Sequence, residues 1–123
     1  MFELTGKTAI VTGAGSKNGI GRATALAFAK QGADVAVCDL NADGVQQVSM
    51  EIKALGRRSL AIQVDVTSPE SVEKAVQTVL NEWGHIDILA NIAGITQPIK
   101  VIDTSPADFD RIVAVNMKGT FLF

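Results

Sequence analysis

The segment TGAGSKNGIG, residues 12–21, lies between a short apolar run that ends at Thr12 and a helical pattern that begins at Ile20. Glycines at this strand-to-helix turn let backbone N–H groups approach a ligand closely. A pyrophosphate bound there would lie at the positive end of the following helix. The segment therefore predicts a nucleotide-binding loop, although a tight structural turn would use the same residues.

Apolar runs and helical patterns alternate along the rest of the chain. The first strand is expected at residues 8–12, and continuous apolar runs predict others at 35–38, 60–64 and 86–90. Helices are expected over residues 20–31, from Val45 to Leu55, and from a Thr67-Ser68-Pro69 start to Gly84. Strands that are apolar on both faces and alternate with helices indicate a parallel sheet covered on both sides, with right-handed crossovers.

Two of the expected helices have a defined apolar side. The buried stripe of the third helix comprises Val72, Val76, Val79, Leu80 and Trp83. After a loop at residues 94–104, a fourth helix begins at the Ser105-Pro106 cap and carries Phe109, Ile112 and Val113 on one side. Helical steps from these residues place Asn116 on the same apolar side, where an amide must find buried partners.

Composition excludes several classes of protein. The chain has 123 residues, 47% of them hydrophobic, with a net charge of -2 and a single Cys. One Cys makes no internal disulfide or zinc site, and Arg57-Arg58 is the longest basic run, so neither a metal nor a nucleic-acid partner is expected. No apolar stretch approaches a membrane span of about 20 residues, and MFELTGK does not resemble a signal peptide. We expect a cytoplasmic domain with no membrane partner.

Asp39 follows the second apolar run and is therefore expected at the carboxyl edge of the sheet. It lies about 20 residues beyond the glycine loop, where an acid accepts hydrogen bonds from the hydroxyls of an adenosine ribose. A carboxylate there repels a 2′-phosphate, which favours NAD over NADP. Lys17 is a contrary sign, because a cation in the loop could serve that phosphate. NAD is the preferred cofactor and NADP the alternative, while a solvated strand-end Asp would explain Asp39 alone.

These residues, with further segments, resemble the short-chain dehydrogenase/reductase family. Its loop T-G-x-x-x-G-x-G matches Thr12-Gly13 and Gly19-Ile20-Gly21, with five residues in place of three between the first two glycines. Asp65-Val66 resembles a D-V pair whose Asp contacts adenine, although Asp65 could simply begin the turn to Thr67. Asn91-Ile92-Ala93-Gly94 resembles N-N-A-G, with Ile92 at the second Asn, and a generic strand-end turn is the alternative.

The resemblance implies a set of site residues. Val115-Asn116 and Gly119 resemble a V-N-x-x-G segment, whose Asn belongs to a catalytic tetrad and holds a water in a proton relay. A core Asn satisfied by backbone groups is the alternative. Asn116 is the expected catalytic residue, no metal ligand is expected, and the expected cofactor-binding residues are Gly13, Ser16, Asn18, Gly19, Ile20, Gly21, Asp39, Leu40, Asp65, Val66, Asn91, Ala93 and Gly94.

The family's chemistry needs a Tyr that exchanges a proton with the substrate oxygen, a Lys four residues later and a Ser, and this sequence contains no Tyr. His85, the other candidate acid, precedes the fourth strand and so lies at the wrong edge of the sheet, where a solvated turn residue is expected.

The resemblance implies that residues 1–123 form one incomplete Rossmann-type dinucleotide-binding region with no second domain. We expect a doubly wound α/β sheet, truncated after four strands and the start of the following helix. Family members are about twice this length, so the chain is expected to be the cofactor half of the enzyme and inactive alone.

The implied activity is an NAD(P)-dependent oxidoreductase that moves hydride between nicotinamide and the carbonyl or secondary alcohol of a small molecule. A 3-oxoacyl thioester, a sugar or a polyol is the implied substrate. A homo-oligomer is also implied, because the helix with Asn116 commonly packs on a partner subunit. A non-catalytic nucleotide-binding module and an interaction domain are the alternatives.

Overall fold

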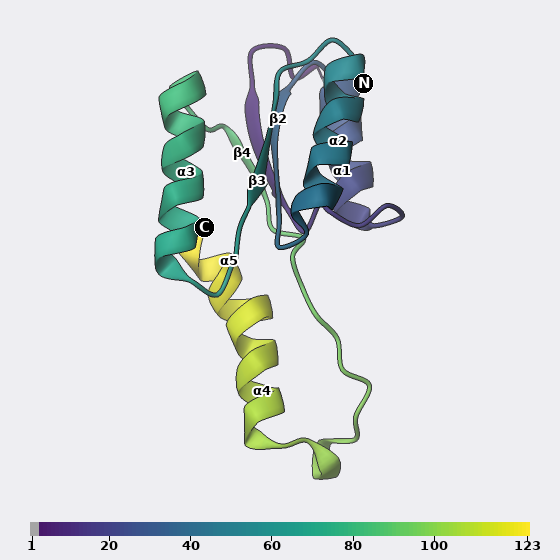
Figure 1. The fold of residues 1–123 in the computed structure, drawn as a ribbon, viewed down its shortest axis with the longest axis vertical. Helices are drawn as coiled ribbons and strands as arrows, with labels where there is room; N and C mark the ends of the chain where they lie inside the picture. The colour runs from purple at the N-terminus through teal and green to yellow at the C-terminus, as the bar shows by residue number, and fades with distance from the viewer. Residues whose placement is uncertain (1–2) are drawn as a thin grey trace.

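The four apolar runs form one parallel sheet in the computed structural model, which describes residues 3–123 (Figure 1). Its strands are β1 (Thr8–Thr12), β2 (Asp34–Asp39), β3 (Ser59–Gln63) and β4 (Ile88–Ala90), in the order β3-β2-β1-β4. Each pair of neighbouring strands is parallel, with Ile10 opposite Ala36 on one side and Leu89 on the other. The expected fold class is therefore confirmed.

Helices cover both faces of this sheet. α1 (Ile20–Lys30) and α2 (Ala42–Ala54) lie on one face and α3 (Pro69–Trp83) on the other (Figure 1). Three helices begin at side-chain caps: the oxygens of Asn41, Ser68 and Ser105 accept the N–H groups of Gly44, Ser71 and Asp108. Gly84 ends α3 in the left-handed conformation, with φ of 81°.

Side chains along β1 and β2 point alternately to the two faces of the sheet and form a hydrophobic core on each face. Ala9 and Val11 point toward α1 and α2 and pack with Val45, Val48 and Ile52. Ile10 and the Cys38 side chain point to the opposite face, where they pack with Val72, Ala75 and Val79 of α3. Since both faces are buried, the strands are continuous apolar runs.

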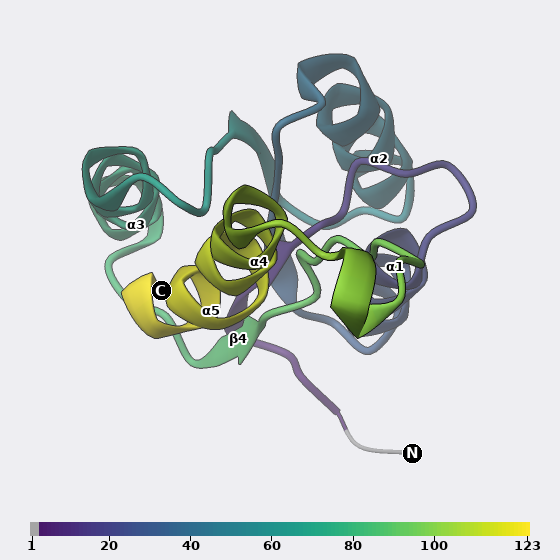
Figure 2. The ribbon, with the colours of Figure 1, turned by 90° about the horizontal axis from the view of Figure 1, so that it is seen from below.

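The chain leaves the sheet after β4. A loop leads through the short helix η1 (Val101–Asp103) to α4 (Pro106–Val113), the π-helical turn η2 (Ala114–Lys118) and α5 (Gly119–Leu122). Figure 1 shows α4 extending beyond the sheet and α5 returning toward α3, and Figure 2 shows the same arm from below. Leu122 and Phe123 pack against the core on the α3 side.

Several sequence-based expectations are corrected. β4 begins at Ile88 instead of residue 86, because the Asp87 carboxylate accepts the Thr8 N–H at 2.9 Å where the ladder would have continued. Leu80, expected in the stripe of α3, is 36% exposed. Phe109 is 61% exposed and no residue of α4 is buried. α4 projects away from the sheet, so its apolar side meets little of the core.

Within residues 3–123, no helix combines the length and the apolar character that crossing a membrane requires.

Candidate functional site

The glycine loop lies where the strand order reverses, between β1 and β4, at the carboxyl edge of the sheet. The Thr12 hydroxyl oxygen accepts the N–H groups of Ile92 and Ala93, each at 3.1 Å, and so joins the ends of the two strands. Gly13 has a φ of 66°, and a Cβ there would lie 2.6 Å from the Ala93 nitrogen. Only glycine permits this approach.

The start of α1 is packed closely on the same loop. A Cβ on Gly21 would lie 2.2 Å from the Gly13 oxygen, so a side chain at Gly21 would force the helix away. Gly19 caps α1 without a side-chain hydrogen bond, and the first turn of α1 holds no acidic residue. The N-terminal amides of α1 are therefore available to an anion.

The lengthened glycine loop contains a turn between Ser16 and Gly19. The Gly19 N–H donates to the Ser16 oxygen at 3.1 Å, and Lys17 and Asn18 between them are exposed. The longer loop thus contains an exposed turn, and Gly13 and Gly21 remain in contact.

Asp39 ends β2 with its carboxylate against the glycine loop. Its Oδ2 accepts the Gly15 N–H and its Oδ1 accepts the Asn41 N–H, both at 3.0 Å. A Cβ on Gly15 would lie 2.8 Å from the Asp39 Cγ. Each carboxylate oxygen keeps a free lone pair, so Asp39 can still accept hydrogen bonds from a ligand.

A cavity of about 960 Å³ opens beside Asp39, between the glycine loop and α2. Its lining includes Ser16 and Lys17 of the loop, Asp43 and Gly44 of α2, and Arg22 of α1. A Cβ on Gly44 would lie 2.0 Å from the Gly15 oxygen, so α2 begins in direct backbone contact with the loop.

An ion pair joins α1 to α2 in the wall of this cavity. Arg22 Nε donates to Glu51 Oε1 at 3.0 Å, and Arg22 Nη2 donates to Glu51 Oε2. The hydrogen bonds between Arg22 and Glu51 raise the pKa of Arg22 and lower the pKa of Glu51. Sequence patterns did not identify Arg22, Asn41, Gly44 and Glu51 as site residues. Only Gly44 carried a signal, because a glycine in the first turn of a helix indicates close backbone contact.

Asp65 follows β3, and its carboxylate is hydrogen-bonded within a local turn. Its Oδ1 accepts the Thr67 N–H at 2.9 Å and the Thr67 hydroxyl at 2.7 Å. These hydrogen bonds lower the pKa of Asp65. Val66 lies against α5, where a Cβ on Gly119 would be 2.9 Å from it. The turn into α3 therefore explains the position of Asp65 by itself.

Asn116 lies in η2, and its amide clamps the loop that follows β4. Its Oδ1 accepts the Ile95 N–H at 2.8 Å and its Nδ2 donates to the Ile95 oxygen at 2.9 Å. Asn116 shares a hollow with Ile112 and Val113, as the helical count predicts. The expectation of buried partners is wrong, because Asn116 is exposed and its partner is the backbone of a surface loop.

The structure thus gathers most of the expected residues at one edge of the sheet. The glycine loop, Asp39 and the segment from Asn91 to Gly94 lie at the strand ends, and Asn116 reaches the residue after Gly94. Exposed apolar side chains flank the loop and Asp39: Ile20 is 73% exposed and Leu40 64% exposed.

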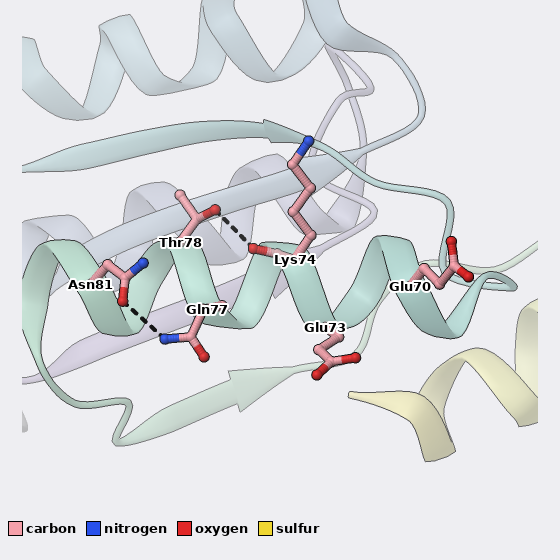
Figure 3. Close-up of a pocket in the computed structure, with 6 residues that line it drawn as sticks. All are labelled: Glu70, Glu73, Lys74, Gln77, Thr78 and Asn81. Atoms are coloured by element: carbon pink, nitrogen blue, oxygen red, sulfur yellow. Dashed lines mark hydrogen bonds between the residues drawn. The ribbon is translucent and has the colours of Figure 1, made fainter.

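Two other polar features lie elsewhere. His85 is at the amino edge of the sheet, as expected, with its Nε2 3.2 Å from the Gly6 oxygen. A hollow on the outer side of α3 is lined by Glu70, Glu73, Lys74, Gln77, Thr78 and Asn81 (Figure 3). The Gln77 amide donates to Asn81 within the helix, which is typical of a solvated helix surface. Over residues 3–123, no group of three or more His, Cys, Asp and Glu side chains is placed to hold a metal ion.

Comparison with known proteins adds independent information. Residues 7–123 match the family model for short chain dehydrogenases. A sorbitol dehydrogenase from Cereibacter sphaeroides is 39% identical over 119 residues, which cover 97% of this chain and 44% of that protein. A D-threitol dehydrogenase from Mycolicibacterium smegmatis is 40% identical over 121 residues, covering 98% and 46%.

Solved structures agree with the sequence relatives. A short-chain type dehydrogenase/reductase from Mycobacterium marinum has a TM-score of 0.92 at 40% identity, covering 98% of this chain and 46% of that one. A 3-ketoacyl-(acyl-carrier-protein) reductase from Brucella melitensis, complexed with NADH, has a TM-score of 0.89 at 40% identity, covering 98% and 48%. The chain spans about half the length of each of these relatives.

Proposed function

This chain belongs to the short-chain dehydrogenase family, and on that premise we propose that its carboxyl-edge site binds the adenosine and pyrophosphate part of NAD. The observation that carries the proposal is the Asp39 carboxylate, which Gly15 and Asn41 orient beside the glycine loop. Its free lone pairs accept the two hydroxyls of the adenosine ribose. Its charge repels a 2′-phosphate, so NAD is preferred to NADP.

The residues at the edge of the sheet fit such a ligand. Gly13 and Gly21 let the glycine loop pack closely on the end of β4 and the start of α1. The uncapped amides of α1 would then bind the pyrophosphate. The exposed side chains of Ile20 and Leu40 offer apolar surface to the planar rings of the nucleotide. Asn91 and Ala93 extend the site along the end of β4, with the Ala93 N–H held by Thr12.

We further propose that the whole protein is an oxidoreductase acting on a carbonyl or secondary alcohol. Bound NAD would accept or supply the hydride. Among the chain's own residues, Asn116 holds the Ile95 backbone and so fixes the loop next to the site; its proposed catalytic part is to help hold a water for proton transfer. The sequence contains no Tyr, so residues 1–123 bind nucleotide and do not supply the proton donor that the family's chemistry uses.

Relatives named for sorbitol, D-threitol and a 3-ketoacyl thioester favour a small hydroxylated or oxo substrate for the whole protein. We propose a sugar, a polyol or a 3-oxoacyl thioester. Self-association is part of the same proposal, because α4 and η2 present an apolar hollow that includes Ile112, Val113 and Met117.

Calorimetric titration of the chain with NAD and NADP tests the proposal. NAD binds more tightly than NADP, and Asp39→Ala weakens NAD binding about tenfold or more, since two charge-assisted hydrogen bonds are lost. Asp110→Ala is the matched control, because this exposed carboxylate of α4 does not line the cavity beside Asp39. Unchanged NAD affinity in Asp39→Ala would refute the role of Asp39. Binding of neither nucleotide would favour an interaction domain that keeps only the fold.

A further inference from the structure

The cavity beside Asp39 contains two cationic side chains in different situations. Lys17 is exposed on the two-residue turn of the glycine loop. Arg22 is held by Glu51 through both Nε and Nη2, with side-chain exposures of 32% for Arg22 and 29% for Glu51. Both partners of this ion pair line the same cavity as Asp39.

This ion pair occupies the groups that would recognise a phosphate. An arginine binds phosphate best when Nε and one Nη donate in parallel, and these are the atoms that Arg22 directs at Glu51. The carboxylates of Asp39 and Asp43 also line the cavity and add negative charge near the ribose. A 2′-phosphate placed beside Asp39 would therefore find the Nε and Nη2 donors of Arg22 already hydrogen-bonded to Glu51.

We propose that Glu51 is a second determinant of cofactor selectivity: by holding Arg22, it withholds an arginine from the 2′-phosphate of NADP. Glu51 is a positioning residue that acts through Arg22 and adds to the direct repulsion by Asp39. The inference rests on the proposed nucleotide-binding function, and it accounts for an arginine in the wall of an NAD site.

A cycle of variants tests the inference with the 123-residue chain. Glu51→Gln keeps the size of the side chain but removes its charge. It should raise the ratio of NADP to NAD affinity about tenfold, as one new charge-assisted phosphate contact from a partly buried arginine implies. Arg22→Gln alone should not raise the ratio, and adding Arg22→Gln to Glu51→Gln should abolish the gain. The increase in the affinity ratio should be smaller in 0.5 M salt, because salt screens a charge interaction but does not weaken a packing contact.

Controls separate selectivity from folding. Thermal unfolding is measured for every variant, Glu51→Ala serves if Glu51→Gln does not fold, and Glu73→Gln on α3 is the matched control. An unchanged ratio in Glu51→Gln, or a gain that persists without Arg22, overturns the inference and leaves the proposed function standing if the wild type binds NAD. A wild-type chain that binds neither nucleotide overturns both.

Discussion

Asp34 begins β2 with its side chain only 4% exposed, which makes it the most buried member of the ion pairs among residues 3–123. Arg57 donates to its Oδ1 at 2.8 Å, and Arg58 Nε donates to its Oδ2 at 2.8 Å. The Arg58 guanidinium also lies 5.5 Å from the centre of the Trp83 ring. This cluster joins β2, the start of β3 and the end of α3 at the amino edge, opposite the proposed nucleotide site.

Asp34 should make stability depend on acid pH. Burial alone would raise the pKa of Asp34, but the hydrogen bonds from Arg58 and the nearby charges of Arg57 and Arg58 outweigh it, so the pKa is lowered. A carboxylate whose pKa is lower in the folded chain stabilises the fold fully above its unfolded value, near 3.9, and this stabilisation is lost as the pH falls through the folded value.

We therefore expect Asp34→Asn to lower the free energy of unfolding by about 2 kcal/mol at pH 7, since it leaves two arginines without their buried partner. The difference from wild type should shrink toward zero at low pH. Denaturant unfolding of both proteins between pH 7 and pH 2.5 measures it, with the exposed Asp110→Asn as control. A difference that is independent of pH would contradict this explanation.

At the scale of elements, the segment from β4 to α5 is held largely by side-chain contacts between a loop and a helix. Asn116 binds both backbone groups of Ile95, and Arg111 Nη2 donates to Gln97 Oε1 at 2.7 Å. The π-helical turn η2 places Asn116 where it makes these contacts. The position of the loop therefore depends on α4 and η2 more than on the sheet.

Replacing Asn116 should release this loop without unfolding the core. Asn116→Ala removes two hydrogen bonds at an exposed position, so we expect a loss of about 1 kcal/mol or less in global stability. The Ile95 amide should exchange with solvent about fivefold faster. Asn116→Asp keeps the oxygen that accepts the Ile95 N–H but replaces the Nδ2 donor with a second carboxylate oxygen. This oxygen repels the Ile95 carbonyl oxygen, so the variant should also loosen the loop. Unchanged exchange at Ile95 in both variants would show that other contacts hold the segment.

The sequence predicts elements well where one local signal decides them. Ser68 and Ser105 mark helix starts because each side chain caps a backbone N–H within three residues. The end of β4 nearest Asp87 could not be predicted, because there a carboxylate replaces a backbone carbonyl as the partner of Thr8. The π-helical turn likewise has no signal in the residues from Ala114 to Lys118, which would suit an ordinary helix.

At the scale of the whole molecule, the site also has parts that a local sequence signal predicts and parts that only tertiary packing determines. The glycine loop and Asp39 could be predicted because the ends of parallel strands meet at one edge of the sheet. Arg22 and Glu51 could not, because they lie on separate helices and meet only through the packing of α1 and α2. Sequence patterns therefore locate the glycine loop and Asp39, while the wall of the cavity beside them depends on tertiary structure.

Two surfaces of the described residues expose a strand edge or large apolar side chains. β4 is an edge strand with β1 as its neighbour, and Leu89 at its centre is 40% exposed. On the projecting arm, Met117 is 68% exposed and Phe121 83% exposed. Unpaired strand edges recruit other strands, and exposed apolar side chains on one arm mark a contact surface.

We expect the 123-residue chain to exceed its monomer mass of 12.9 kDa in light scattering at concentrations of about 10 µM and above. Leu89→Lys should shift the distribution toward monomer if β4 pairs edge to edge, because a lysine on an edge strand opposes pairing. Phe121→Lys should do so if the arm forms the contact, and comparing the two variants identifies the surface. Circular dichroism confirms that each variant keeps its fold. A monodisperse, folded monomer at about 100 µM would contradict association through either surface, and it would mean that the free edge of β4 is protected by its short length.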